Sequence, residues 1–358
     1  MRRRYIDCMR GVAVLIMIEA HVVDAWTRLA DRGSVGYRDL TILGGFAAPL
    51  FLSLAGVALA LSAGRVAATD VSRRAQGATI VRRGAEIFIL AFLFRLQAFV
   101  VTPGSHLVTL FRVDILNVMG PAIAAAGLVH MISATRVAFA VMSGVLATAI
   151  AMLTPTLRIA SWVDVLPIWL QWYLRPAGEH TTFTLFPWSG FVFAGAAIGA
   201  VLVGSRERRS ERLLLASIAA AGLALVVVGF YTASLPTMYR SASFWESSPT
   251  YFAIRVGVIA VSVGIASAVL PLAHWVPGPF VVVERFGRQS LFIYWIHVEL
   301  VYGYLTWAIH RRLPVWGTVV AYVLFAALMY GTISLRAFLV GLWRARGHQA
   351  LAQRPSLG

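Results

Sequence analysis

Apolar stretches of about 20 residues recur along the whole chain, and this recurrence limits the folds that the chain can adopt. Hydrophobic residues make up 59% of the 358 residues and charged residues 13%, whereas soluble domains contain about 25% charged residues. A helix of about 20 apolar residues is long enough to cross a bilayer. Because lipid offers no hydrogen-bond partners, the backbone that crosses it must satisfy its own polar groups. The sequence therefore predicts an all-α fold, a polytopic transmembrane helix bundle.

The apolar stretches predict about ten spans. Their expected ranges are 7–27, 41–63, 84–102, 115–133, 137–153, 184–204, 212–232, 251–271, 289–308 and 316–340. The long connection after the fifth span carries Trp162, Trp169, Trp172 and Tyr173, aromatic side chains that are typical of a helix lying in the headgroup layer. We expect a single transmembrane domain over residues 1–345 and a short cytoplasmic tail over residues 346–358.

The strong positive charge of the chain predicts its orientation rather than a nucleic-acid partner. All 31 basic residues are Arg, against 15 acidic residues, and they recur between apolar segments instead of forming one patch. Such a distribution is typical of topology signals that face anionic lipid on the cytoplasmic side. With ten spans, one face receives both termini and the following arginines: Arg2, Arg3, Arg4, Arg65, Arg73, Arg74, Arg82, Arg83, Arg206, Arg208, Arg209, Arg212, Arg285, Arg288, Arg344 and Arg346. We expect cytoplasmic termini, membrane lipids as partners and no nucleic acid.

The first predicted span contains several ionisable side chains. Arg10 and His21 are 11 residues apart, so they lie on one stripe of the helix, about 20° apart in direction and about 16 Å apart along the axis. Asp24 follows His21 by three residues, so the two side chains can meet and form the pair that a general base needs. Alternatively, the charged groups lie near the helix ends and reach water. Glu19 points to the other side of the helix.

Two further polar groups stand out. In the predicted ninth span, Ser290, Tyr294, His297 and Tyr304 share a stripe by their spacing. His297 belongs either to an active cavity or to an interhelical hydrogen bond that only fixes the bundle. At the start of the fourth span, Arg112, Asp114 and Asn117 form either a wall of an outward-facing entrance or, for Arg112 and Asp114, a surface ion pair.

Other candidate sites are few. Cys8 is the single cysteine, which excludes an internal disulfide and a zinc site built from cysteines. No histidine spacing suits a metal, so no metal is expected. Glu86, Arg95, Arg255 and Arg336 lie inside predicted spans, where an arginine either holds a phosphate or pairs with a carboxylate.

Four stretches carry a family resemblance: RYIDCMRGVAVLIMIEAH, APLFLSLAGVALAL, FPWSGFVFAGAAIGA and RFGRQSLFIYWIHVELVYG. In this order they resemble motifs of the membrane acyltransferases related to heparan-α-glucosaminide N-acetyltransferase. The matching positions are Arg4, Asp7, Arg10, Gly11, Pro49, Gly56, Pro187, Trp188, Gly195, Gly287, Arg288, Ser290, Tyr294 and His297. The spacing from Arg10 to His21 is also similar to the arginine–histidine signature of polysaccharide O-acyltransferases.

The resemblance implies a bacterial inner-membrane enzyme that takes an acetyl group from cytosolic acetyl-CoA. The acceptor would be an amine or hydroxyl of an extracytoplasmic saccharide or glycoconjugate. We expect His21, Asp24 and His297 to be catalytic and Arg10, Asp7, Arg288 and Tyr294 to bind the donor. The expected acceptor-binding residues are Asp39, Arg112, Asp114, Asn117 and Trp188.

One departure from the family concerns the catalytic histidine. Lysosomal members carry it in the loop after the first span, and here that loop, TRLADRGSVGYRDL, contains none, so His21 would take its role. The alternatives are a proton-coupled transporter or exporter, whose proton relays also need buried ionisable groups, and an enzyme-like scaffold without activity. The sequence leaves open whether the chain forms a homo-oligomer.

Overall fold

Helices dominate the computed structural model, which describes residues 3–66, 71–102, 104, 106–205 and 208–352. Within these ranges the extended pairings are two isolated bridges, Thr27–Leu313 and Val113–Thr181. The chain divides into two compact units. The first combines Met1–Gly45 with Ala273–Gly358, and the second is Phe46–Leu272. The prediction of one domain over 1–345 stays a prediction, and Arg2, Arg206 and the last residues of the predicted tail, 353–358, lie outside the described ranges.

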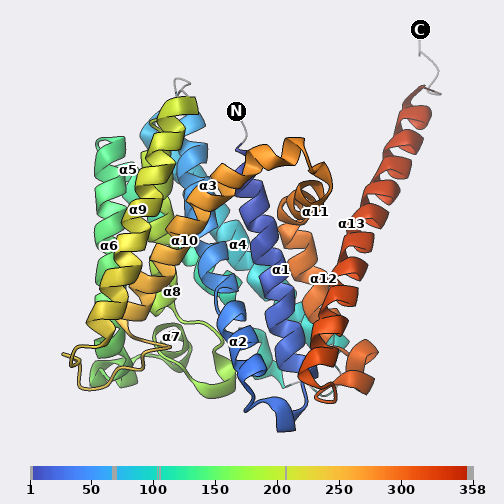
Figure 1. Ribbon diagram of the computed structural model, residues 1–358, viewed down its shortest axis with the longest axis horizontal. Helices are drawn as coiled ribbons and strands as arrows, with labels where there is room; N and C mark the ends of the chain where they lie inside the picture. The colour runs from blue at the N-terminus through green and yellow to red at the C-terminus, as the bar shows by residue number, and fades with distance from the viewer. Residues whose placement is uncertain (1–2, 67–70, 103, 105, 206–207, 353–358) are drawn as a thin grey trace. The chain divides into compact units, whose positions relative to one another are not determined.

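The first unit is built around its N-terminal helix. Its elements are α1 (Arg4–Trp26), η1 (Leu29–Asp31), α2 (Val35–Gly44), α11 (Pro277–Arg288), α12 (Ser290–Tyr302), η6 (Tyr304–Ile309) and α13 (Val315–Ala352). Helix α1 packs against α2, α11, α12 and α13, as Figure 1 shows. The first helix therefore contacts α11, α12 and α13, which lie more than 250 residues later in the sequence.

Backbone hydrogen bonds join the end of α1 to the segment before α13. The backbone N–H of Arg311 donates to the carbonyl of Ala25 at 3.0 Å, and that of Leu313 donates to Trp26 at 2.9 Å. The N–H of Arg28 returns a bond of 2.9 Å to Leu313. Arg311 has a φ of 53°, which is uncommon for a side chain other than glycine. These bonds fix the end of the helix that carries His21.

Two motif glycines allow α1 and α11 to touch through their backbones. A Cβ atom at Gly11 would lie 1.9 Å from the carbonyl oxygen of Val283, and one at Gly287 would lie 1.9 Å from that of Asp7. Only glycine fits at such distances, as in other close helix crossings. These positions of the family resemblance therefore serve packing.

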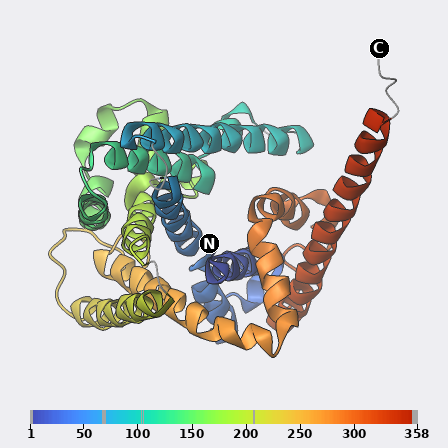
Figure 2. The ribbon, with the colours of Figure 1, turned by 90° about the horizontal axis from the view of Figure 1, so that it is seen from above.

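The second unit is a bundle of longer helices. Its elements are α3 (Ala47–Val66), α4 (Arg73–Val101), η2 (Leu107–Phe111), α5 (Ile115–Ile132), α6 (Arg136–Arg158), η3 (Ser161–Val165), α7 (Ile168–Leu174), η4 (Gly178–His180), α8 (Leu185–Leu202), α9 (Arg208–Ala233) and α10 (Pro249–Val269), with η5 (Leu270–His274) at its end. Helix α4 packs along α5 and α9 along α10, while α8 contacts both α3 and α6 (Figure 2). A Cβ atom at Gly195 of α8 would lie 1.9 Å from the carbonyl oxygen of Ser53 in α3, so this crossing also needs glycine.

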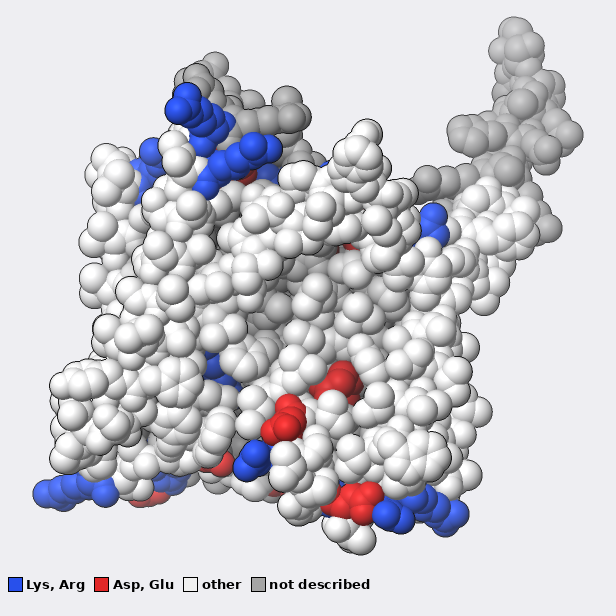
Figure 3. Space-filling view, in the orientation of Figure 1, with Lys and Arg blue, Asp and Glu red and all other residues white. Residues whose placement is uncertain are grey.

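Eight helices in the described ranges are long and apolar enough to cross a membrane, by their length and composition. They cover Val35–Gly64, Arg73–Val101, Ile115–Ile132, Arg136–Arg158, Leu185–Leu202, Arg209–Ala233, Pro249–His274 and Val315–Trp343. The face drawn in Figure 3 is largely free of charge, and its arginines gather near helix ends, for example where α9 begins. An all-helical membrane protein is thus confirmed.

The two remaining predicted spans, α1 and α12, lie outside this set of eight. Helix α1 has 23 residues but carries Arg4, Asp7, Arg10, Glu19 and Asp24. Helix α12 has only 13 residues, about 20 Å at 1.5 Å per residue, which is shorter than the hydrocarbon core of about 30 Å. The range 289–308 was wrong at its end, because the extended backbone of Gly303 stops α12 and Tyr304 therefore leaves the predicted stripe.

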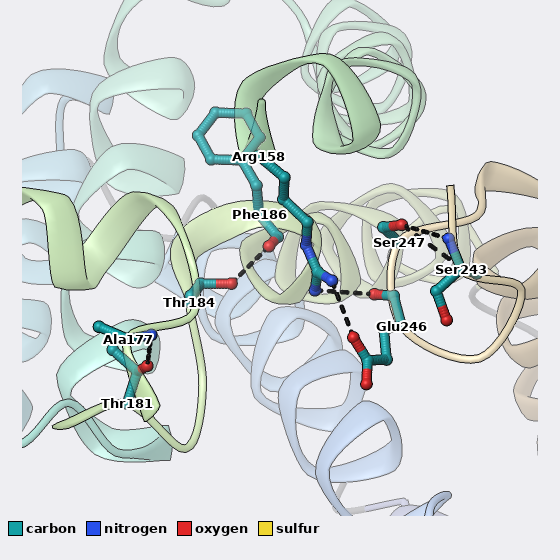
Figure 4. A network of polar contacts seen from close by, with 8 residues as sticks. All are labelled: Arg158, Ala177, Thr181, Thr184, Phe186, Ser243, Glu246 and Ser247. Atoms are coloured by element: carbon teal, nitrogen blue, oxygen red, sulfur yellow. Dashed lines mark hydrogen bonds and ion pairs between the residues drawn. The ribbon is translucent and has the colours of Figure 1, made fainter. Parts of the chain in front are cut away.

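Polar contacts brace the loops of the second unit (Figure 4). Arg158, at the end of α6, donates to a carboxylate oxygen of Glu246 at 3.0 Å and to its backbone carbonyl at 3.2 Å.

The connection before α8 was expected to carry a helix in the headgroup layer, and the structure places the short helix α7 there. Trp169 is 54% exposed, but Trp172 is only 5% exposed and packs with Val113 and Val118, so it belongs to the core.

Candidate active site

Two histidines from distant parts of the sequence meet in the first unit. The Nδ1 atom of His21, on α1, lies 2.8 Å from Nε2 of His297, on α12. The two rings stack with their centroids 5.0 Å apart. His297 is fully buried, whereas His21 keeps part of its surface exposed. Of the two residues, only His21 is therefore partly exposed.

The hydrogen bonds fix the tautomers of the two neutral rings. Nδ1 of His297 lies 2.8 Å from the carbonyl oxygen of Ile293, which can only accept, so this nitrogen carries a proton. Nε2 of His297 is then the acceptor, and Nδ1 of His21 must donate to it. This leaves the lone pair of the neutral His21 ring on its Nε2 atom. The pair thus presents one basic nitrogen, held in a defined tautomer by its neighbour.

Asp24 takes a different place from the one expected. The hydroxyl of Tyr302 donates to Oδ2 of Asp24 at 2.9 Å, and the guanidinium of Arg32 lies 3.8 Å from Oδ1. The Tyr302 ring also meets the His21 ring edge-on, with centroids 5.7 Å apart. The ring of His21 is therefore oriented by His297, and Asp24 lies beside it, joined through Tyr302.

Arg10 and Ser290 connect α1 and α12 nearer their starts. Nη2 of Arg10 donates to the hydroxyl of Ser290 at 3.1 Å, and Ser290 is only 7% exposed. Tyr294 lies one turn further along α12, and its ring centroid is 6.0 Å from that of His297. The predicted stripe is thus present as a row of polar side chains. Asp7 is buried where α1 meets α11.

A cavity of about 380 Å³ lies between α11 and α13 and was not predicted. It is lined by Arg285, Arg288, Gln289, Ile333, Ser334 and Ala337. Two guanidinium groups, an amide and a hydroxyl provide many hydrogen-bond donors, a set that suits phosphate oxygens. The arginines were visible in the sequence, but their neighbours on α13 become apparent only through the packing of the two helices.

Glu284 binds two arginines, one of which lines this cavity. Its carboxylate accepts two bonds of 3.2 Å from Arg4 and one of 3.1 Å from Arg288. Burial raises the pKa of Glu284, but the hydrogen bonds and charges of the two arginines outweigh it, so that the pKa lies below its ordinary value. The carboxylate therefore stays ionised and holds Arg288 at the cavity.

The other predicted residues near α5 lie in the second unit. Asp114 forms an ion pair with Arg95 of α4 instead of with Arg112, whose guanidinium donates to Thr182 at 3.0 Å. The amide oxygen of Asn117 accepts from the backbone N–H of Asp114 at 3.0 Å. Asn117 is 1% exposed. The surface ion pair between Arg112 and Asp114, one of the two readings of this motif, is therefore not formed.

Trp188 and Asp39 have separate surroundings. Trp188 packs edge-on against Phe183 at 4.8 Å between ring centroids, and Arg255 lies over its ring at 5.7 Å. Asp39 is exposed on α2 and lies 3.6 Å from Arg38. The structure therefore brings together the predicted residues of α1 and α12, whereas Asp39 lies apart on α2. No group of three or more metal-ligating side chains was found among the described residues.

Comparison with known proteins gives one family. The model of the family "heparan-α-glucosaminide N-acetyltransferase, catalytic" matches residues 2–236. This range includes α1 with Arg10, His21 and Asp24, and most of the second unit, while α11, α12 and α13 follow it. Curated proteins give no match. The matched range covers well over half of the sequence, and the chain therefore belongs to the heparan-α-glucosaminide N-acetyltransferase catalytic family of membrane acetyltransferases.

Proposed function

We propose that the protein transfers an acetyl group from cytosolic acetyl-CoA to an amine or hydroxyl of an extracytoplasmic saccharide or glycoconjugate. The observation that supports this most is the bond between His21 and His297, because it provides one accessible basic nitrogen in a chain of an acetyltransferase family. A general base of this kind accelerates acyl transfer by about 10²–10⁴-fold.

In the proposed reaction, Nε2 of His21 accepts the proton of the acceptor amine or hydroxyl. The acceptor atom forms a bond to the thioester carbonyl carbon while the bond from that carbon to sulfur breaks, and the proton passes from His21 to the leaving thiolate. His297 is a positioning residue that keeps His21 in its tautomer. Asp24 stabilises the positive charge that develops on His21, and Tyr294 donates toward the carbonyl oxygen.

The cavity beside Arg285 and Arg288 is the proposed site for the phosphates of the donor. Its hydrogen-bond donors fit such a group, and Gln289 and Ser290 follow directly along the chain toward Tyr294 and His297. Within α12, the seven residues from Ser290 to His297 correspond to about 11 Å, a distance that an extended pantetheine arm can cover. Arg10 and Asp7 complete the proposed donor site on α1.

The orientation follows from this assignment. We propose a bacterial inner-membrane protein with cytoplasmic termini, so that the arginine cavity faces the cytosol. Arg112, Asp114, Asn117, Trp188 and Asp39 stay predictions for acceptor binding. Trp188 packs in an aromatic cluster of the second unit, and the amide of Asn117 donates to the hydroxyl of Tyr173 at 3.4 Å. Both contacts support the proposed role, since sugars pack on aromatic rings and hydrogen-bond to buried amides.

Purified protein, acetyl-CoA with a labelled acetyl group and a panel of amino sugars and neutral saccharides test the proposal. Wild type should transfer label, and His21→Ala should reduce the transfer by at least about 10²-fold with donor binding retained. His106→Ala is the matched control, because His106 is an exposed loop histidine. Absence of acetyl-CoA binding in the wild type would refute the proposal, and movement of unacetylated solute across vesicles would support a transporter instead.

A further inference from the structure

Glu19 is a buried carboxyl group on the side of α1 that does not face the histidines. It is two residues before His21, which corresponds to about 200° around the helix. Only 4% of its surface is exposed. Neither of its two carboxylate oxygens has a hydrogen-bond partner among the described residues. Glu19 takes no part in the bond between His21 and His297.

The carboxyl lies at a cavity of about 180 Å³ within the first unit. Its walls come from α1, α2 and α13, and they consist of Val12, Leu15, Ile16, Glu19, Val23, Leu40, Leu43, Val319 and Tyr322. Apart from Glu19 and the phenol of Tyr322, every lining side chain is aliphatic. Val12, Leu43 and Val319 are 42%, 46% and 40% exposed, so the cavity has an apolar mouth.

The surrounding helices hold the carboxyl in place. A Cβ atom at Gly44 of α2 would lie 2.8 Å from the Cβ of Ala20 and 3.2 Å from Oε2 of Glu19, so α2 packs directly on this part of α1. A buried polar group without a partner destabilises the fold, and an ionised one does so more strongly. An aliphatic side chain here would avoid that destabilisation, which indicates that a ligand supplies the missing donors.

We propose that this cavity binds the head of a primary alkyl ammonium, a site separate from that of acetyl transfer. An ammonium group has three N–H donors, enough for both oxygens of Glu19, and its positive charge pairs with the carboxylate. Its alkyl chain lies against the aliphatic walls. The volume holds about six groups of water size, at about 30 Å³ each, and a longer chain leaves through the apolar mouth into lipid.

The test uses the full chain in phosphatidylcholine nanodiscs, without acetyl-CoA, and n-hexylamine as the probe. Because a ligand of the folded state raises the unfolding midpoint with its concentration, n-hexylamine should raise that of wild type. n-Hexanol should act at least tenfold more weakly and n-hexanoate not at all. Glu19→Gln should weaken n-hexylamine binding at least tenfold. Glu86→Gln is the matched control, since Glu86 is a partly exposed helical carboxylate paired with Arg82 and Arg83.

A second variant keeps the test independent of the carboxyl. Val319→Phe fills the mouth and should also weaken n-hexylamine binding at least tenfold, while His21→Ala, on the opposite side of α1, should bind it as wild type does. This last variant separates the cavity from acetyl transfer, because its loss of activity leaves the binding readout intact. Equal binding of n-hexylamine by wild type, Glu19→Gln and Val319→Phe, or equal binding of n-hexylamine and n-hexanol by wild type, would overturn the proposal.

Discussion

His21 and His297 are joined by a bond of 2.8 Å between Nδ1 and Nε2, and their ring planes are inclined by 17°. The second nitrogen of His297 is used by the backbone carbonyl of Ile293. The buried ring therefore has no free nitrogen for a substrate, and the partly exposed ring has one. This asymmetry gives the two histidines different roles, which the variants below distinguish.

Removal of the acceptor on His297 should impair catalysis through the tautomer of His21. His297→Leu leaves Nδ1–H of His21 unpaired, and we expect kcat to fall by about 10²–10⁴-fold, since a catalytic histidine in the wrong tautomer loses activity on this scale. His297→Gln keeps an acceptor oxygen and should recover part of the loss. Steady-state kinetics with saturating donor measures both variants. If His297→Leu retained wild-type kcat, the positioning role would be refuted.

The arginine cavity should determine donor binding. Loss of a hydrogen bond to a charged group costs about 1.5–3 kcal/mol, so Arg285→Gln and Arg288→Gln should each raise KM for acetyl-CoA by about 10–100-fold, with a smaller change in the acceptor KM. Arg38→Gln is the control, because Arg38 is 69% exposed and only paired with Asp39. A larger change in acceptor KM than in donor KM would contradict the assignment.

The crossing of α3 and α8 should not tolerate a methyl group. At Gly56 a Cβ atom would lie 2.0 Å from the carbonyl oxygen of Val192, so Gly56→Ala should force the helices apart and cost about 1–3 kcal/mol. Gly144→Ala in α6 is the matched control, because no atom lies within 4 Å of its added Cβ and alanine favours the helix. Thermal unfolding in detergent should show a lower midpoint for the first variant only.

Glu284 should give the protein an acid-sensitive contact. Its pKa is lower in the folded chain than its ordinary value, which is about 4.3, so the carboxylate form stabilises the fold. This contribution is complete above the ordinary value and is lost as the pH falls through the lower, folded value. Glu284→Gln should therefore unfold a few degrees below wild type at pH 7.

The difference in midpoint between wild type and Glu284→Gln should stay constant from pH 7 down to about 4.3 and shrink as the pH falls further, to about 3. Unfolding curves recorded over this range measure it. A constant difference over the whole range would show that the bonds to Arg4 and Arg288 do not act through the charge of the carboxylate.

The apolar stretches predicted most of the long helices within a few residues, because length and hydropathy are local properties. Two bounds were wrong by more than ten residues: α4 begins at Arg73 rather than 84, and α13 ends at Ala352 rather than 340. The stripe of Arg10 and His21 also followed from helix geometry. The partner of His21 did not, since Asp24 is close in sequence while His297 is 276 positions away. Only the packing of α1 on α12 decides between them.

Packing between helices that are distant in sequence also explains other differences between the prediction and the structure. Asp114 has a nearby arginine in the sequence, Arg112, but its partner is Arg95 of the preceding helix. Helix α11 was missed because it has only 12 residues and carries Glu284, Arg285 and Arg288. The arginine cavity needs side chains of α13, such as Ser334, that no local pattern connects with Arg288.

The backbone hydrogen bonds between α1 and the residues before α13 have a consequence for biosynthesis. Helix α1 leaves the ribosome before its partners α11, α12 and α13, which are made only after the whole of Phe46–Leu272. Contacts this distant in sequence form late, because domains fold as they are synthesised from the N-terminus. A nascent chain stopped before α12 would hold His21 without His297, so the bond between the two histidines forms only after α12 has been synthesised.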